Sequence, residues 1–234
     1  MTAILSTDAV TAGYGGAMVL RGVSVALGPG EVLAVLGKNG MGKTTLLKTI
    51  MGFLPVRHGR VHLDGQDITG RAPHRVARDG VAYAPQEFTI FQDLTVEENL
   101  RLGAPDDRRF AERVGALHDV FPRMLERLKQ RAGTLSGGEQ KMLLMSRALI
   151  ARPRVMLVDE ISEGLQPTMV ERMAEAIATA RTTHGVAVLM VEQHLGFALS
   201  VADRFAVLKL GEIVEEGVAG GRADATALAE HLKV

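Results

Sequence analysis

The sequence predicts an α/β fold with a mostly parallel sheet, and three patterns in its 234 residues lead to that expectation. Continuous apolar runs, typical of buried strands, alternate with segments of helical apolar spacing. Residues 1–35 alternate apolar and polar positions between glycine turns, which favours short antiparallel strands. From about residue 88 to residue 150 only helical spacing remains. We therefore expect one domain over residues 1–234, with an antiparallel N-terminal β subdomain and a helical subdomain inserted at about 88–150.

Each expected element rests on a local pattern. In the first part of the chain we expect a buried strand at 31–37, a helix at 43–54, a strand and turn at 59–68, a short helix at 73–80 and a strand at 81–86. In the insert, helical spacing covers 95–102, 108–121, 123–132 and 138–151. Alternation then resumes with a strand at 154–160, a helix at 168–185, a strand at 186–192, a short helix and a hairpin at 204–217.

Composition excludes several classes of protein. Lys and Arg (27 together) balance Asp and Glu (27 together), so no overall field draws the chain to nucleic acid or anionic lipid. The absence of cysteine excludes disulfides and thiolate metal sites. The N-terminus does not resemble a signal peptide, and the apolar runs fall far short of the roughly 20 residues that span a bilayer. We expect a soluble, intracellular protein that another protein holds at any membrane where it works.

The stretch "GKNGMGKTT" is the strongest signal for chemistry. It fits the pattern G-x-x-x-x-G-K-[ST] between a predicted strand and a predicted helix, the context that this phosphate-binding loop requires. Its glycines let backbone N–H groups turn toward phosphate oxygens, and the start of the helix adds partial positive charge. Lys43 would reach the outer phosphates, and the Thr44 hydroxyl would bind Mg²⁺. The predicted nucleotide-binding residues here are Gly37, Lys38, Asn39, Gly40, Met41, Gly42, Lys43, Thr44 and Thr45.

The stretch "RVMLVDE" supplies a complementary half of such a site. It is an apolar strand that brings Asp159 to its carboxyl end, where open α/β sheets bind ligands. Asp159 suits a magnesium site, and Glu160 suits the polarisation of an attacking water.

A third motif, "LSGGEQ" (135–140, the signature motif below), narrows the choice among phosphate-loop ATPases. With the phosphate loop, "YAPQ" and "MLVDE" in the expected order, the chain resembles an ABC-transporter ATPase subunit over essentially its whole length. The resemblance implies the ABC type of phosphate-loop NTPase fold and hydrolysis of ATP with Mg²⁺. It also implies that Tyr14 stacks on adenine, and that Gln86 lies at the magnesium and senses a membrane partner. Three residues would contact the ATP bound by an opposite subunit: Ser136, Gly137 and Gly138.

The signature motif also has a plain structural interpretation. Ser136 and Glu139 have the spacing of a helix-capping box. Both interpretations are compatible, because a capped helix start still offers N–H groups and a dipole to a γ-phosphate.

Smaller phrases resemble one branch of the family. "LTVEENLRLG", "LSGGEQK" and "VEQ" followed by "AD" are similar to ATPases of importers for branched-chain amino acids and related compounds, and "EGLQP" favours the urea and short-amide members. The resemblance implies a peripheral protein at the cytoplasmic face of the membrane. Its partners would be membrane permease subunits, a second ABC ATPase subunit that is a related but different chain and, indirectly, a substrate-binding protein.

Three positions depart from the usual family pattern. Ile161 stands where most members carry proline after the catalytic glutamate, so the turn should be less rigid. Gln166 stands near the usual position of an aspartate, so no cross-subunit contact through that carboxylate is assumed. The family's phosphate-sensing histidine corresponds by spacing to Gln193, and His194 lies one place too late. We expect Gln193 to act in catalysis and His194 to start the next helix.

Some alternatives stay open at this point. An exporter ATPase would share every phosphate-site motif, and only "VEQ" and "EGLQP" argue against it. ABC ATPases that act on nucleic acid or ribosomes typically carry long insertions or a second ATPase domain, which this length does not hold, so we expect no nucleic-acid partner. The apolar residues after Gln86 (Phe88, Ile90 and Phe91) fit either a groove for the membrane subunit or the core of the insert.

Overall fold

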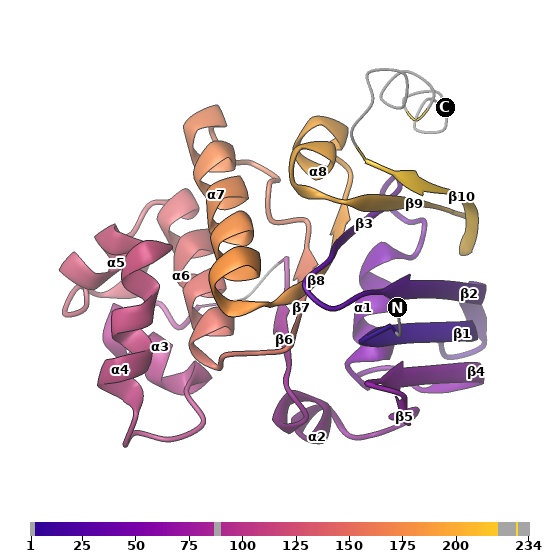
Figure 1. Cartoon of the computed structure of the whole chain (residues 1–234), viewed down its shortest axis with the longest axis horizontal. Coiled ribbons are helices and arrows are strands. Elements are labelled where there is room, and N and C mark those ends of the chain that lie inside the picture. The colour runs from indigo at the N-terminus through magenta and orange to yellow at the C-terminus, as the bar shows by residue number, and fades with distance from the viewer. Residues whose placement is uncertain (1–2, 87–89, 220–227, 229–234) are drawn as a thin grey trace.

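The structure is a computed structural model that describes residues 3–86, 90–219 and 228 (Figure 1). Two sheets and the helices around them form the α/β class predicted from the sequence. The larger sheet has the strand order β10-β9-β3-β8-β7-β6, and all neighbouring pairs are parallel except β9 with β10. Its strands are β3 (Val32–Leu36), β6 (Val81–Ala84), β7 (Val155–Asp159), β8 (Ala187–Glu192), β9 (Arg204–Lys209) and β10 (Glu212–Val218).

Both faces of the larger sheet are covered, which explains why its central strands are continuous apolar runs. Successive side chains of a strand point to opposite faces. In β3, Val32, Ala34 and Leu36 accordingly join a core with α6 (Gly137–Ile150), α7 (Pro167–His184) and α8 (Leu195–Val201). Leu33 and Val35 join a second core with α1 (Lys43–Ile50) and the smaller sheet. Figure 1 shows α6 and α7 on one side of these strands and α1 on the other.

The smaller sheet is antiparallel, as predicted, with the order β2-β1-β4-β5. Its strands are β1 (Leu5–Tyr14), β2 (Ala17–Leu27), β4 (Val56–Leu63) and β5 (Gln66–Asp67). The strands β1 and β2 are longer than the short strands that we expected, because Gly13 and Tyr14 of "GYGG" still belong to β1 and only Gly15 and Gly16 form the turn, with Gly15 at φ 56°.

The helices α1 and α2 differ in how well their ends were predicted. The helix α1 ends at Ile50 rather than at residue 54, because Gly52 has φ +78° and its α-carbon faces the carbonyl oxygen of Arg71, 2.1 Å from where a Cβ would lie. A side chain there would clash, so only glycine fits this close approach. The short helix α2 (Pro73–Arg78) begins with a proline at its first position and ends just before Gly80.

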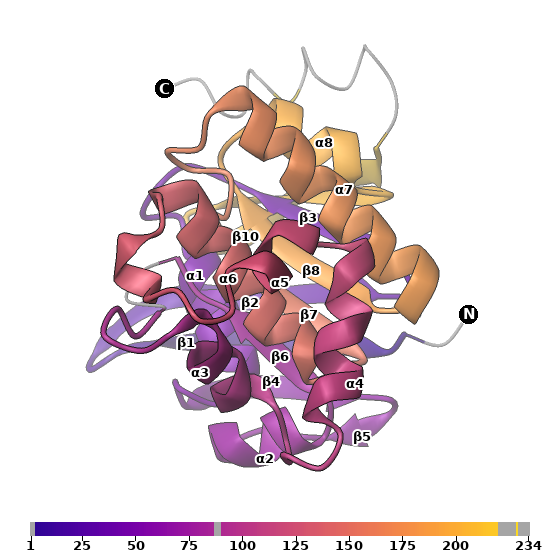
Figure 2. The same cartoon turned by 90° about the vertical axis from the view of Figure 1, so that its left-hand side faces the viewer.

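The insert is helical, as expected, but its middle differs from the prediction. Its helices are α3 (Val96–Gly103), α4 (Phe110–Gly115), η1 (Ala116–Asp119), α5 (Pro122–Glu126), η2 (Ala132–Thr134) and α6. Pro122 starts a new helix, since proline cannot continue the preceding one. The prediction of one helix over 123–132 was wrong: the backbone of Gln130 and Ala132 instead pairs with Val96 and Leu94. Figure 2 shows these helices together on one side of the molecule.

Within the described ranges, no helix combines the length and the apolar character that a membrane span requires.

The buried side chain of Asn99 on α3 holds the chain before that helix. Its Oδ1 accepts a hydrogen bond from the Phe91 N–H at 2.9 Å, and its Nδ2 donates to the Phe91 and Thr95 carbonyl oxygens at 2.9 and 3.0 Å. Since Asn99 is 0% exposed, water cannot replace these bonds without a change in structure.

We expect Asn99→Ala to lower the free energy of unfolding by about 1–3 kcal/mol, because it leaves partly buried backbone groups without partners. Urea unfolding of the full chain measures the effect. Asp93→Ala, which removes an exposed side chain from the same loop, serves as control and should change stability by less than about 0.5 kcal/mol. Equal unfolding midpoints for the two variants would contradict this prediction.

Candidate active site

The candidate site lies where three parallel strands end side by side. In the register of the sheet, Leu36 at the end of β3 faces Glu192 at the end of β8, and Asp159 at the end of β7 faces Val191. The chain segments that follow these strands therefore leave the sheet at one edge, the place where open α/β sheets bind ligands. This brings the phosphate loop, the Asp159–Glu160 pair and Gln193 to the same edge of the molecule.

The phosphate loop curls into the start of α1 and forms a cleft of about 410 Å³ (the phosphate cleft). The residues that line it are Val19, Asn39, Gly40, Gly42, Lys43, Thr44, Thr45, Gln86 and Glu160. Gly42 has φ +107° and lies against the side chains of Val19 and Leu20, so a side chain there would be strained and crowded. Six of the nine residues predicted from the phosphate-loop motif thus line one cleft.

Lys43 lies at the floor of the cleft and is buried. Its ammonium donates to the carbonyl oxygens of Gly37 at 2.7 Å and Lys38 at 2.8 Å, and forms an ion pair of 2.9 Å with Glu160 Oε1. An ammonium has three N–H donors, so these three oxygens satisfy it. A buried charge requires such a partner, and here Glu160 provides the counter-charge.

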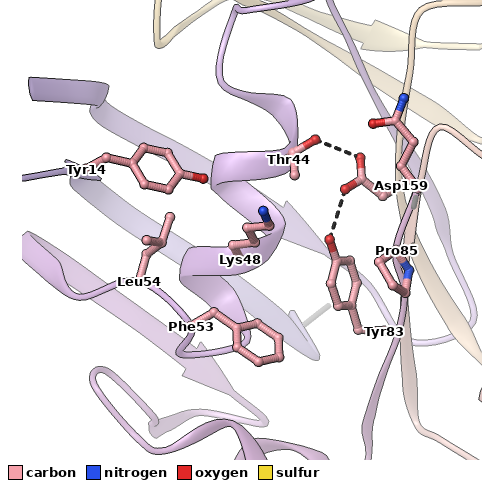
Figure 3. A pocket seen from close by; sticks show the side chains of 9 residues that line it. Tyr14, Thr44, Lys48, Phe53, Leu54, Tyr83, Pro85 and Asp159 are labelled. Carbon is pink, nitrogen blue, oxygen red and sulfur yellow. Dashed lines mark hydrogen bonds between the residues drawn. The ribbon is translucent and has the colours of Figure 1, made fainter. Parts of the chain in front are cut away.

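Asp159 is fully buried, and both of its carboxylate oxygens accept hydrogen bonds (Figure 3). Oδ1 accepts from the Thr44 hydroxyl at 3.0 Å, and Oδ2 accepts from the Tyr83 hydroxyl at 2.9 Å. Burial raises the pKa of Asp159, whereas the hydrogen bonds from Tyr83 and Thr44 and the charge of Lys43 oppose that shift. Burial and the neighbouring Asp159 also raise the pKa of Tyr83, which keeps its hydroxyl protonated as a donor.

Tyr83 was missed by the sequence analysis. It lies on β6, which pairs in parallel with β7, and its register partner is Leu157. A polar ring in a short apolar strand is the one local signal that could have drawn attention to it. Its partner could not be inferred, because the order of strands in the sheet is not visible in the sequence.

Gln86 and Glu160 meet across the cleft. Gln86 Nε2 donates to Glu160 Oε2 at 3.0 Å and to Glu163 Oε2 at 2.6 Å. Glu160 itself has a left-handed backbone with φ 45°, which is strained for a residue with a side chain and is often found at functional sites. Its carboxylate is thus held between the amide of Gln86 and the ammonium of Lys43.

The oxygen atoms around Thr44 and Asp159 are the kind that Mg²⁺ prefers. The Thr44 hydroxyl and Asp159 Oδ1 lie 3.0 Å apart, and Gln86 adds an amide oxygen at the rim. Within the described residues, no three His, Asp or Glu side chains gather where they could hold a metal by themselves. One carboxylate and one hydroxyl match a magnesium ion that also binds substrate phosphates, so the donor set fits.

Tyr14 ends β1 beside a second pocket of about 610 Å³ that adjoins the phosphate cleft (Figure 3). Tyr14 is 48% exposed. Apolar and aromatic residues form part of the wall, and the other residues that line it are polar or charged; the first group is Phe53, Leu54, Tyr83 and Pro85, and the second is Thr44, Lys48, Gln86 and Asp159. Stacking on adenine stays a prediction.

The signature motif starts α6, and its capping box is present. Ser136 is the N-cap residue; Glu139 Oε2 accepts from the Ser136 N–H at 2.9 Å, and the Ser136 hydroxyl accepts from the Glu139 N–H at 3.4 Å. Ser136 and Gly137 are exposed. The lining of the phosphate cleft includes none of Ser136, Gly137 and Gly138, so the fold does not bring these three predicted residues to this chain's own cleft.

Gln193 and His194 lie beyond the end of β8. Both are exposed, and they line a pocket of about 490 Å³ together with Glu160, which also lines the phosphate cleft. Because β8 ends at Glu192, strand alternation does not place Gln193 and His194 on opposite faces of the sheet. What distinguishes them is capping: His194 is the N-cap of α8, and its Nδ1 accepts from the Phe197 N–H at 3.1 Å.

Comparison with known proteins decides the family. The family model described as ABC transporter matches residues 20–163, which is more than half of the chain. The chain belongs to the ABC transporter family. The predicted resemblance is confirmed, and with it ATP hydrolysis as the activity of this ABC ATPase.

Several relatives of the ABC ATPase are similar along almost the whole chain. One is the high-affinity branched-chain amino acid transport ATP-binding protein BraG of Pseudomonas aeruginosa, 40% identical, with 90% of this chain and 91% of the relative covered. Another is the probable branched-chain amino acid transport ATP-binding protein LivF of Archaeoglobus fulgidus, 38% identical, with 92% of each chain covered. These relatives come from the branch that the sequence phrases predicted.

A solved structure agrees with the fold of the ABC ATPase. The ADP conformation of an ATP-binding cassette of an ABC transporter aligns with a TM-score of 0.88 at 27% identity, over 98% of this chain and 96% of that one. The predicted phosphate-loop fold of the ABC type is therefore confirmed.

Proposed function

We propose that this ATPase drives an importer for branched-chain amino acids or related small amides, through separate membrane subunits. The observation that carries the cargo class is the 40% identity to BraG over 90% of the chain. The urea-type amides stay within the proposal because of the "EGLQP" phrase at 163–167. An exporter would share the phosphate cleft, so the cleft alone does not separate the two directions of transport.

The site geometry supports a division of labour among the residues of the cleft. Lys43 is already surrounded by oxygen atoms and would exchange Glu160 for the outer phosphates of ATP. This exchange frees the Glu160 carboxylate to polarise the attacking water. Thr44, Asp159 and Gln86 would hold Mg²⁺, which supplies charge neutralisation at the phosphates. Tyr83 keeps the Asp159 carboxylate in a fixed orientation.

The signature motif supports a partnership between two ATPase chains. Ser136 and Gly137 are exposed at the N-terminus of a 14-residue helix and do not line this chain's own cleft. Backbone N–H groups and the dipole at such an end favour a phosphate group. We infer that they meet the ATP of a second, related subunit, and that this chain's ATP meets that subunit's motif in turn.

A membrane partner at the cytoplasmic face is supported by two exposed aromatic side chains, Phe53 in the pocket that Gln86 also lines and Phe91 five positions after Gln86 in the chain. Phe91 is 57% exposed and Phe53 is 55% exposed. Ile90, in contrast, packs against the core of the insert, and Phe88 lies outside the described residues. Each of the two interpretations of this segment thus applies to a different residue. Ile90 packs in the core, while Phe91 is available to a partner.

The first test concerns binding and hydrolysis. We expect Lys43→Ala to weaken ATP binding at least about tenfold, because it removes the charge that neutralises the phosphates. Glu160→Gln should bind ATP as the wild type does and lose about 10²-fold or more in turnover, since only the general base is altered. Equilibrium ATP binding and steady-state ATPase rates of the full chain measure both. Wild-type turnover by Glu160→Gln would refute the role of Glu160.

A second test compares neighbouring residues. Gln193→Ala should reduce turnover about 10²-fold, because the amide is lost as a donor to the γ-phosphate. His194→Ala should reduce it less than about threefold, because only the start of α8 loses a cap. The two variants are measured side by side in the assembled complex. The reverse order would show that His194, not Gln193, contacts the phosphate.

A third test concerns the cargo and the membrane partner. In cells that lack this gene, the wild-type chain should restore uptake of labelled leucine, and Phe91→Glu should not, although its ATPase rate and soluble expression persist. Val218→Glu, which changes a 72% exposed valine on β10, is the matched control and should transport normally. Restored uptake of urea instead of leucine would assign the cargo to the small amides. Normal uptake with Phe91→Glu would exclude Phe91 from the interface.

A further inference from the structure

The segment after the catalytic glutamate needs support from elsewhere in the fold. Glu160 adopts the left-handed backbone conformation, which costs free energy for a residue with a side chain. Ile161 replaces the proline that would stiffen the next position, and its side chain is buried. Contacts outside the segment must therefore keep it in this conformation.

Lys141, in the second turn of α6, provides one such contact. Its ammonium donates to the carbonyl oxygens of Ile161 at 3.0 Å, of Glu160 at 3.5 Å and of Glu163. These three bonds use all three of its N–H donors. Burial lowers the pKa of Lys141, and the neighbouring carboxylates of Glu163, Glu192 and Glu160 oppose the shift.

A second side chain also binds this segment, and the residues that follow the segment pack against α6. Both carboxylate oxygens of the buried Glu192 accept from Ser162, from its N–H at 3.1 Å and from its hydroxyl at 2.8 Å. At Gly138 a Cβ would lie 2.7 Å from Met169 Cε and 3.5 Å from Leu165 Cδ2. The first turn of α6 therefore packs against Leu165 and Met169, which follow the segment in the chain.

We propose that Lys141 is a positioning residue for ATP hydrolysis, because it clamps the carbonyl groups of residues 160–163 and so holds the Glu160 carboxylate at the phosphate cleft. The proposal rests on the function proposed above for Glu160. It also links α6, whose first residues form the signature motif, to the group that polarises water. A displacement of α6 would shift Glu160 through this clamp.

Loss of these Lys141 hydrogen bonds should affect turnover and ATP affinity differently from loss of a contact that only stabilises the fold. Lys141 does not line the phosphate cleft, so its loss should leave ATP affinity unchanged. It acts on the backbone that carries Glu160, so its loss should lower turnover. A purely structural role would reduce the stability of the chain without this separation of turnover from affinity.

The experiment begins with Lys141→Met, which keeps the length of the side chain and removes its charge and donors. We expect kcat to fall about 10- to 100-fold, as a misplaced catalytic group would cause, while the Kd for ATP stays within about twofold. The stoichiometry of ATP binding gives the fraction of folded, competent chains. Lys129→Met, an exposed lysine of the same insert, is the control and should hydrolyse ATP at the wild-type rate. A kcat for Lys141→Met within twofold of wild type, or an equal loss of affinity, overturns the proposal.

A double-mutant cycle tests whether Lys141 acts through Glu160. In single-turnover measurements, Lys141→Met should slow hydrolysis in the wild-type background and change it by less than about twofold in the Glu160→Gln background. The same loss in both backgrounds would overturn the proposal. Lys141→Arg keeps the charge and several donors, so it should hydrolyse faster than Lys141→Met, and a rate as low as that of Lys141→Met would also overturn it.

The cycle separates this proposal from the one on which it rests. Wild-type turnover by Glu160→Gln would overturn both, because Glu160 would then have no role for Lys141 to support. Loss of turnover in Glu160→Gln, together with a wild-type rate in Lys141→Met, would overturn the clamp alone.

Discussion

The parallel pairing of β3, β8 and β7 is the constraint on which the site depends. Backbone hydrogen bonds hold Leu36 beside Glu192 and Asp159 beside Val191, so three segments distant in the sequence must leave the sheet together. Each of the three strands is entirely buried, which makes their order and register costly to change. The buried strands therefore hold the residues of the site in fixed relative positions.

Several charged side chains are buried at this edge of the sheet. Lys43, Asp159, Glu160 and Glu192 are all buried, and such groups are costly unless hydrogen bonds and ion pairs satisfy them. Here Lys43 pairs with Glu160, while Thr44 and Tyr83 satisfy Asp159. The result is a set of polar groups held in fixed orientations, which suits the positioning and electrostatic stabilisation that phosphoryl transfer requires.

The helical insert also contacts the site directly through side chains of α6. The first turn of α6 packs against Leu165 and Met169, and the Lys141 ammonium donates to the Ile161 carbonyl oxygen. Asn99 holds the exposed Phe91 at the other end of the insert. The insert therefore contacts the site through Lys141 and leaves Phe91 exposed near its start.

The sequence by itself determined the features that depend on local chemistry. The phosphate loop, the capping box at Ser136 and most strands and helices follow from short patterns, because backbone geometry and capping act over a few residues. Asp159, Glu160 and Gln86 could be recognised from their motifs, although no motif shows that Gln86 bridges two glutamates.

Only the tertiary structure decided the strand order, the early end of α5, and the partners of Tyr83, Lys141 and Glu192. Each of these depends on contacts between residues far apart in the chain, such as the pairing of β6 with β7 or of Gln130 with Val96. A local pattern holds no information about which distant group will satisfy a buried donor or acceptor, since that choice is made by packing of the whole core.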